Sequence, residues 1–515
     1  MLLFDPSLIS RIDNFAKDSL GIPTRTLMLR AAEAVVGTVN SLVQKGNKIC
    51  IFAGKGNNGG DGYAAALLLM NDYDVKVYDV FGAGQRSDEG RYYLDSFLSS
   101  GGIVDTLKLD KKTRADIESA SCIIDAVFGT GFTGKLPEEA AELAKLFSSL
   151  TDVISIAIDV PLGVNASDGT VDKSACYRAT TTVVLGFLKP GLVSYPAREY
   201  VGKLIYDNIG LHCDAVLSEF KPNDYYIDYE LASSFIPSRT QNSNKGTFGK
   251  LLMITGSKEY PGAGHLSLEA ALRSGVGYVT YLGEEAMCNS LVGKLPEAIY
   301  KPCDIHNIDS DTLNEVVTLS SKSSAILVGS GSPPTDGLFA VVDRLLSENG
   351  APLILDAGAI NVLKSANGYL ISAIKNARRK VIITPHPLEF SRLLGIPLDA
   401  VTEHRLTIAK VFARENNCIL VLKGAATIVT DGVKTYINSS GSSALAKAGS
   451  GDVLAGFLAG VISYTDDPLN ASALSVYFHG LAGDTLAKEL SEFGVIPSDL
   501  PREIARQLAK AIKST

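Results

Sequence analysis

The sequence lacks the features that mark membrane-spanning, secreted or nucleic-acid-binding proteins. No apolar run reaches the roughly 20 residues of a transmembrane helix, and the N-terminus lacks the basic and long apolar segments of a secretory signal. No block of Lys and Arg stands out, and 48 basic residues against 56 acidic ones give a net charge of −8. We therefore expect neither a membrane nor a nucleic acid among the partners.

Cysteine is scarce. The seven cysteines are scattered and odd in number, and no two of them form a CxxC pair. This pattern argues against a disulfide framework and a zinc site, and it favours a reducing compartment, the cytoplasm. The composition, 46 % hydrophobic and 20 % charged, is that of a soluble globular protein. Because 515 residues are too many for one hydrophobic core, we expect two or three domains.

Short apolar runs alternate with helical patterns along most of the chain, which is typical of an α/β protein. Such alternation predicts parallel sheets with helices on both faces and ligands at the carboxyl ends of the strands. The polar, turn-rich stretch 216–245 interrupts the pattern, and we predict a linker there between domains at 1–215 and 246–515. Buried strands are predicted over 48–53, 75–80, 122–126 and 153–159, and over 250–255, 325–329, 352–356, 380–384, 419–423 and 427–430.

The most informative segment is KAGSGD at 447–452, which opens directly into the apolar run VLAGFLAGVI. Small residues before an apolar helix place unpaired backbone N–H groups and the positive end of the helix dipole at one spot. Such a spot suits a phosphate or a developing oxyanion. Asp452 would repel that anion unless it had a task, such as taking a proton from a hydroxyl, so we predict a general base. A capped helix with an acid in its first turn is the alternative.

A glycine-rich loop in the first half directly follows a predicted strand. The run GKGNNGGDG over 54–62 has five glycines, which permit close backbone approach, and side-chain oxygens from Asn57, Asn58 and Asp61. A loop with both features suits a phosphate-bearing ligand or a hard cation. A tight turn between strand and helix is the alternative.

Two later strand ends in this half also carry polar groups. GTGFTGK over 129–135 follows the strand that ends near Asp125, and a mobile surface loop is the alternative there. Asp159 ends a third apolar strand, where an ionised carboxylate is costly unless a partner or a reaction needs it. A helix N-cap is the alternative for Asp159.

Together these motifs resemble the N-terminal domain family of NAD(P)H-hydrate epimerases, over roughly residues 1–211. The resemblance implies a Rossmann-like three-layer αβα sandwich that interconverts the R and S hydrates of NADH and NADPH, with Asp159 as the catalytic acid and base. It implies K⁺ ligands at Asn58, Asp125 and the backbone carbonyl of Leu162, which stands where the family usually has Ser or Thr. The implied substrate contacts are Asn57, Asn58, Gly59, Gly60, Asp61, Gly129, Thr130, Gly131, Phe132, Thr133, Gly134, Lys135 and Asp159.

The second half carries two further polar motifs at predicted strand ends. Prolines on both sides of His386, in TPHPLE, fix it in an extended turn, and Glu389 follows three residues later. A rigidly held His suits a phosphate, a metal-bound water or a substrate, and a purely structural turn is the alternative. KGAAT over 423–427 closes a strand with a cation and a glycine, as nucleotide phosphates require.

The order of these motifs resembles the ribokinase-like αβα fold and, more closely, the ADP-dependent NAD(P)H-hydrate dehydratases, over roughly residues 240–513. The resemblance implies ADP as co-substrate, Mg²⁺, and Asp452 as the catalytic base. The implied contacts with the hydrated dinucleotide are Ala263, Gly331, His386 and Asp452, and those with the nucleotide are Lys423, Gly424, Ala425, Ala426, Thr427, Gly449, Ser450 and Gly451.

Both halves thus point to repair of one damaged metabolite. We predict a bifunctional enzyme, assembled as a homo-oligomer, that epimerises hydrated NADH or NADPH and dehydrates the S form while ADP becomes AMP and phosphate. The alternative is a vitamin or sugar kinase of the ribokinase-like type with a non-catalytic N-terminal oligomerisation or scaffold domain. His386 stands where vitamin kinases have Asn, and the intact NNGGD loop argues against a mere scaffold.

Overall fold

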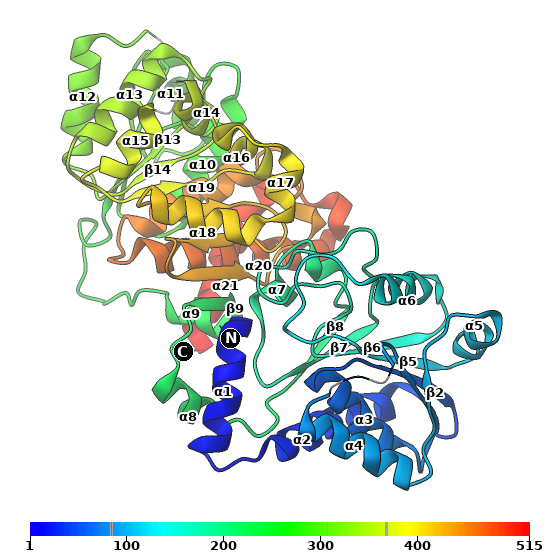
Figure 1. Ribbon diagram of the computed structural model, residues 1–515. Coiled ribbons are helices and arrows are strands. Elements are labelled where there is room, and N and C mark those ends of the chain that lie inside the picture. Colours follow the sequence, from blue (N-terminus) through cyan, green and yellow to red (C-terminus); the bar gives the residue numbers. More distant parts are fainter. Residues whose placement is uncertain (83, 85, 306, 366–368, 515) are drawn as a thin grey trace. The chain divides into compact units, whose positions relative to one another are not determined.

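The computed structural model describes residues 1–82, 84, 86–305, 307–365 and 369–514, and it divides the chain into two compact units (Figure 1). The first unit comprises 2–224 and 403–405, and the second comprises Met1, 225–402 and 406–515. Each unit has its own sheet with helices around it, which confirms the predicted two-domain α/β class.

Part of the stretch predicted as a linker, 216–245, is regular structure. Strand β9 (Asp224–Ile227) and helix α9 (Tyr229–Ser234) lie within it. Ile227 and Ala232 are fully buried in the core of the second unit. These few apolar side chains outweigh the polar, turn-rich composition around them, because their burial fixes the backbone between the polar residues.

A seven-stranded sheet with parallel neighbours forms the centre of the first unit, in the order β4-β3-β2-β5-β6-β7-β8. The order reverses direction between β2 and β5, so the loops after these two strands flank the switch point. The strands of this sheet are β2 (Lys48–Ala53), β3 (Asp74–Asp79), β4 (Val104–Thr106), β5 (Cys122–Ala126), β6 (Ile154–Ile158), β7 (Thr181–Leu185) and β8 (Lys203–Asp207), and the short strand β1 (Leu2–Leu3) lies outside it.

Alternate residues of β2 supply two different cores. Ile49 and Ile51 pack in the core that contains α2 and α3, whereas Cys50 and Phe52 pack in the core that contains α6. This alternation is the two-sided burial expected of a strand with helices on both faces. The helices are α1 (Pro6–Asp18), α2 (Thr24–Leu42), α3 (Asn57–Leu69), α4 (Asp88–Ser99), α5 (Lys111–Glu118), α6 (Glu138–Ser149), α7 (Pro190–Val193), η1 (Ala197–Glu199) and α8 (Cys213–Glu219).

The sheet of the second unit runs in the order β9-β18-β17-β16-β15-β14-β13-β10-β11-β12. Strands from β12 to β16 pair in parallel, whereas β17 pairs antiparallel with both β16 and β18. The strands after β9 are β10 (Lys250–Ile254), β11 (Tyr278–Gly283), β12 (Ile299–Pro302), β13 (Ala325–Val328), β14 (Leu353–Leu355), β15 (Val381–Ile383), β16 (Ile419–Leu422), β17 (Ile428–Thr430) and β18 (Thr435–Asn438).

Helix α19 (Ser450–Ile462) lies in the core of the second unit, and its residues from Val453 to Ile462 are all buried. It packs closely on α10 (Pro261–Arg273), since a side chain at Gly456 would overlap the carbonyl of Ser267. The other helices are α11 (Glu285–Val292), α12 (Ser310–Ser320), α13 (Asp336–Ser347), α14 (Gly358–Ser365), α15 (Tyr369–Asn376), α16 (Pro387–Leu394), α17 (Leu398–Glu403), α18 (Arg405–Glu415), η2 (Ser443–Leu445), α20 (Pro468–Gly494), η3 (Pro497–Asp499) and α21 (Leu500–Ser514).

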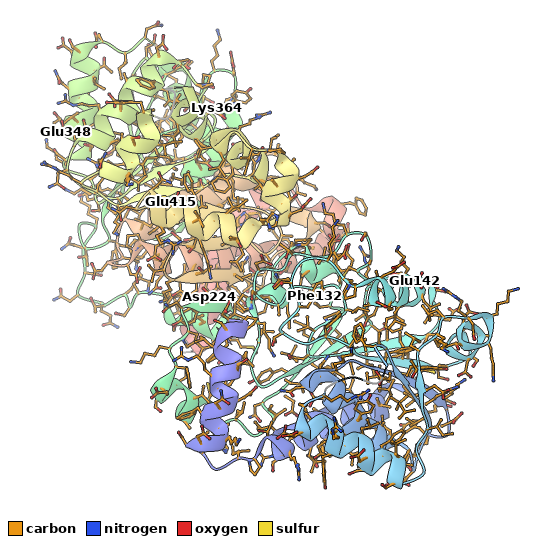
Figure 2. All side chains as sticks on the ribbon, in the orientation of Figure 1. Phe132, Glu142, Asp224, Glu348, Lys364 and Glu415 are labelled. Carbon is orange, nitrogen blue, oxygen red and sulfur yellow. The ribbon has the colours of Figure 1, made fainter. Side chains whose placement is uncertain are left out.

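Charged side chains gather on the outer faces of the helices, as Glu142, Lys364 and Glu415 illustrate (Figure 2). Within the described part of the chain, no helix combines the length and the apolar composition needed to span a bilayer.

Candidate active sites

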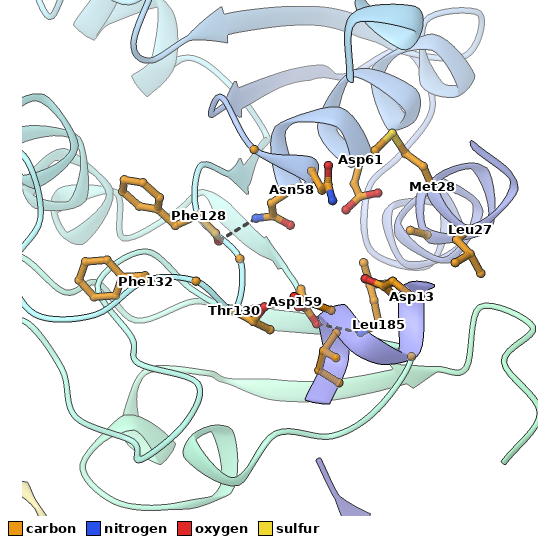
Figure 3. A pocket seen from close by; sticks show the side chains of 18 of the residues that line it. Asp13, Leu27, Met28, Asn58, Asp61, Phe128, Thr130, Phe132, Asp159 and Leu185 are labelled. Atoms are coloured by element: carbon orange, nitrogen blue, oxygen red, sulfur yellow. Dashed lines mark hydrogen bonds between the residues drawn. The ribbon is translucent and has the colours of Figure 1, made fainter. Parts of the chain in front are cut away.

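The first unit holds a cavity of about 630 Å³ at the carboxyl ends of β2, β5, β6 and β7 (Figure 3). Helix α1 and the loops that follow these strands line it. Because the sheet order reverses between β2 and β5, this is the crevice in which parallel sheets bind ligands. The predicted substrate contacts that line the cavity are Asn57, Asn58, Asp61, Gly129, Thr130, Gly131, Phe132 and Asp159.

The NNGGD motif forms the first turn of α3, which begins at Asn57 directly after the N-cap residue Gly56. A side chain at Gly59 or Gly60 would overlap atoms of the same loop or of α2. These two glycines therefore allow the loop to pack closely and do not line the cavity. Of the second predicted loop, Thr133, Gly134 and Lys135 also lie outside the cavity lining.

Asn58 and Asp125 differ in how their oxygens are satisfied. Asn58 Nδ2 donates to the Phe128 carbonyl at 2.8 Å, whereas Asn58 Oδ1 is buried without a hydrogen-bond partner among the described residues. Asp125 is fully buried and accepts hydrogen bonds from Leu162 N at 2.7 Å and Tyr177 Oη at 3.0 Å, both at Oδ2. Burial raises the pKa of Asp125 to about 6, although these donors oppose the shift.

Asp159 follows β6 with a φ of +64°, a left-handed conformation that is uncommon for residues other than glycine. Its carboxylate forms an ion pair with Lys189, whose side chain is 1 % exposed. Asp159 Oδ1 also accepts the N–H of Leu185 at 3.1 Å, and Lys189 Nζ donates to the Leu185 carbonyl at 2.8 Å. These bonds hold the Asp159 carboxylate in one orientation at the cavity wall.

Two further carboxyl groups, Asp13 and Asp61, line the same cavity. Burial raises the pKa of Asp13 to about 6, with Lys189 opposing the shift and Asp159 adding to it. Burial also raises the pKa of Asp61 well above its ordinary value, and the charges of Asp159 and Asp13 add to that shift. Sequence reasoning missed Asp13 and Lys189, because neither lies in a glycine-rich motif or at a predicted strand end.

In the second unit, helix α19 begins directly after its N-cap residue Gly449, which has a left-handed backbone conformation. Asp452 lies in the first turn of this helix. Burial raises the pKa of Asp452 to about 7, with Asp356 adding to the shift and Lys423 opposing it. A carboxyl group with this pKa can accept a proton at neutral pH and release it again. The predicted base is thus near the ammonium group of Lys423 and at the N-terminus of a helix, where backbone N–H groups lack intrahelical partners.

Lys423 follows β16 and forms a buried ion pair with Asp356, 3.0 Å from Nζ to Oδ1. Burial lowers the pKa of Lys423, but the nearby carboxylates, Asp356 first among them, outweigh burial and raise it. A side chain added at Gly451 would lie 3.3 Å from Lys423 Nζ, so the KGAAT and GSGD motifs meet at this ammonium group. Asp356 was missed as a site residue, because only the fold brings it beside Lys423.

His386 caps α16. Its Nδ1 accepts the N–H of Glu389 at 3.2 Å, and its own N–H donates to Glu389 Oε2 at 2.9 Å. Burial lowers the pKa of His386, and the charge of Glu389 partly opposes the shift. The neutral ring therefore carries its proton on Nε2. His386 thus forms a structural turn at the start of α16, and the predicted contact between His386 and the substrate would use Nε2–H.

The remaining predicted contacts of the second unit lie in the first turn of α10, after β13 and after β16. A side chain at Gly331 would overlap Ala263, so these two residues are adjacent. Thr427 Oγ1 donates to the Gly424 carbonyl at 2.8 Å and closes the turn that holds Ala425 and Ala426, of which Ala426 has a φ of +49°.

Among the described residues, no group of three or more His, Cys, Asp and Glu side chains is placed to hold a metal ion.

Two family models match the chain. One, described as the YjeF-related protein N-terminus, matches residues 24–191, and the other, described as NAD(P)H-hydrate dehydratase, matches residues 251–506. A bifunctional NAD(P)H-hydrate repair enzyme from Moorella thermoacetica is 31 % identical and covers 97 % of this chain and 95 % of its own length. Its counterpart from Escherichia coli is 30 % identical over 96 % of this chain and 91 % of its own length.

A solved structure of a ribokinase-like superfamily protein from Enterococcus faecalis is similar in fold. It is 24 % identical, covers 57 % of this chain and 98 % of its own, and superposes with a TM-score of 0.50. This likeness concerns the fold alone and agrees with the predicted ribokinase-like architecture.

Proposed function

The chain belongs to the family of bifunctional NAD(P)H-hydrate repair enzymes, and we propose that its two activities are divided between its two units. The predicted bifunctional epimerase and dehydratase is thereby confirmed over the alternative of a vitamin or sugar kinase. The first unit would interconvert the R and S hydrates, and the second would dehydrate the S form. The family models support this division, since each matches one unit.

The epimerase site is the cavity of the first unit, and the ion-paired Asp159 is the observation that carries this assignment. A carboxylate held at the wall of a crevice can move a proton to or from the hydroxyl at C6 of the reduced nicotinamide ring. The lining supports a bound dinucleotide, because it combines apolar side chains such as Leu27 and Phe132 with backbone N–H groups of glycine loops.

The dehydratase site is the N-terminus of α19, and the raised pKa of Asp452 beside Lys423 carries this assignment. Asp452 would take the proton of the C6 hydroxyl as its oxygen attacks the terminal phosphoryl group of ADP, and AMP leaves. Phosphate then leaves C6 while a proton is lost from C5, which restores the nicotinamide. Lys423 and the helix N–H groups would stabilise the charge on the transferred phosphoryl group.

The first unit contains a buried oxygen that a K⁺ ion could bind. Asn58 Oδ1 is a buried acceptor without a partner among the described residues, and a cation would satisfy it. At Asp125, Val127 N donates to Oδ1 at 3.2 Å, which leaves a lone pair of that oxygen available. We keep Asn58, Asp125 and the Leu162 carbonyl as proposed ligands. The ion would fix the loop that carries Asn58.

The described residues do not build a Mg²⁺ site on their own. Both oxygens of Asp356 already accept hydrogen bonds, from Thr384 and Lys423 at Oδ1 and from Ser330 at Oδ2. Mg²⁺ commonly arrives with the phosphates of a nucleotide, which supply several of its ligands. The residues present therefore assign no step of the reaction to Mg²⁺.

Assembly into a homo-oligomer and a cytoplasmic location remain proposals, the latter supported by seven free thiols.

The division of activities is tested by adding the protein to a mixture of R and S NADH hydrates and following absorbance at the reduced-nicotinamide band. With ADP, the native chain should restore the absorbance of both hydrates. The Asp159→Asn variant should restore the absorbance due to the S hydrate at the native rate. The rise should then stop, apart from slow spontaneous epimerisation. Asp452→Asn should restore almost none. Equal behaviour of the two variants would refute the division.

A further inference from the structure

Helix α1 carries a carboxyl group on its apolar face. Ile9, Ile12 and Ala16 have the spacing of one helical stripe, and Asp13 lies within that stripe. Ile9, Ile12 and Asp13 all line the cavity of the first unit. An acid on the buried face of a helix costs folding free energy unless it is paired or serves a reaction.

The same cavity receives Asp13 and Asp159 from separate segments of the chain (Figure 3). Asp13 comes from α1, which precedes the residues 24–191 that the family model matches. Asp159 comes from the end of β6. The cavity therefore presents a carboxyl group from each of two independently placed elements, and this is what an inversion at a ring carbon requires.

The charged groups around Asp13 and Asp159 give these two carboxyl groups different surroundings. Lys189 forms its ion pair with Asp159 and not with Asp13. Asp13 lines the same cavity and feels the charges of both members of this pair, and Asp61 from α3 is the other carboxyl group in the lining. Burial favours the neutral form of Asp13, and its pKa is raised to about 6. The substrate site is thus lined by both carboxyl groups, of which Asp13 takes up a proton more readily than an exposed Asp does.

We propose that Asp13 is the second catalytic residue of epimerisation and that it exchanges protons with the C6 hydroxyl on the ring face opposite to Asp159. This inference rests on the proposed epimerase function of the cavity. In one direction, the lone pair of N1 expels the C6 hydroxyl, and Asp13 gives that hydroxyl its proton, so that water leaves and an N1–C6 iminium ion remains.

Water then adds to C6 from the other face, and Asp159 takes the proton that this water loses. The C–O bond broken and the C–O bond formed balance, and the single proton has moved from Asp13 to Asp159. The opposite epimer reacts in the reverse sense. The pair therefore works with one shared proton in both directions, and its apparent pKa values belong to the pair.

The test uses the full chain and purified S hydrate of NADH without ADP, with the R hydrate measured by chromatography. Asp13→Asn should lower the epimerisation rate by ~10²–10⁴, the loss expected for a missing acid–base group. The matched control is Asp18→Asn, at the exposed end of the same helix, which should react at the native rate. Dehydration of the S hydrate with ADP should be unchanged in both variants, and far-UV circular dichroism should show that the first unit remains folded.

The pH profile separates a proton carrier from a residue that merely shapes α1. Native epimerisation should decline in both directions as pH rises above about 6, the pKa of Asp13, because the shared proton is lost, and Asp13→Glu should keep that decline. The residual rate of Asp13→Asn should lack it. A rate for Asp13→Asn within threefold of the native one, or loss of the decline in Asp61→Asn instead, would overturn the inference. An inactive native cavity would overturn the epimerase proposal itself.

Discussion

Lys423 and Asp356 form a buried ion pair in the second unit, with Nζ and Oδ1 3.0 Å apart and the side chains 16 % and 2 % exposed. Asp356 directly follows β14 and Lys423 directly follows β16. The ion pair therefore connects the ends of the two strands that flank β15. The ammonium group thus offsets the charge of Asp356 and remains fixed beside Gly451.

Lys423→Met should destabilise the chain and abolish dehydration. Removing one partner of a buried pair leaves the other charge without compensation, at a cost of about 3–5 kcal/mol. The hydroxyls of Thr384 and Ser330 still donate to Asp356, so we expect the lower end of this range. Urea unfolding measures the loss. The control is Lys301→Met, which breaks the exposed pair with Glu315 and should cost less than about 1 kcal/mol. Equal losses would contradict the buried geometry.

Dehydration should rise with pH through about 7, because Asp452 accepts a proton only as the carboxylate. The same raised pKa costs stability. The folded state holds this proton more tightly than the unfolded chain, so the free energy of unfolding falls as pH rises from the ordinary Asp value of 3.8 to about 7.

Asp452→Asn should therefore raise the free energy of unfolding at pH 8, on the order of 4 kcal/mol, and leave it nearly unchanged at pH 3. The same variant should lose dehydration at every pH. Thermal unfolding at the two pH values, with the native chain alongside, measures the difference. A stabilisation of similar size at both pH values would mean that the proton on Asp452 is not its cause.

K⁺ should stabilise the first unit, and the effect should depend on Asn58. Filling the unpartnered Asn58 Oδ1 removes the cost of a buried acceptor, so K⁺ should raise the unfolding temperature more than Li⁺ does. Because the ion favours ionised Asp125, whose pKa is about 6, K⁺ binding should weaken as pH falls below 6. Asn58→Ala should remove the K⁺ effect. An unchanged effect in this variant would place the ion elsewhere.

The local elements could be predicted because buried parallel strands appear as short apolar runs, and β5 (Cys122–Ala126) matches its predicted range. Asp452 could be found because glycines and an apolar helix adjoin it in sequence. Lys189 and Asp356 could not be found, since each acquires its role from a partner far away in the chain. The apolar stripe of α1 did carry a signal for Asp13, in the form of a carboxylate among buried positions.

Gly456→Ala should test whether the packing of α19 on α10 positions the catalytic helix. A methyl group at this position would overlap the Ser267 carbonyl, so the two helices must separate. Overpacking of this kind costs typically ~1–3 kcal/mol, and separation would shift Asp452 relative to Lys423. We expect a lower kcat for dehydration with a normal rate of epimerisation. The control is Gly293→Ala, because a side chain there would meet open space. Native dehydration in the Gly456 variant would show that the site does not depend on this helix contact.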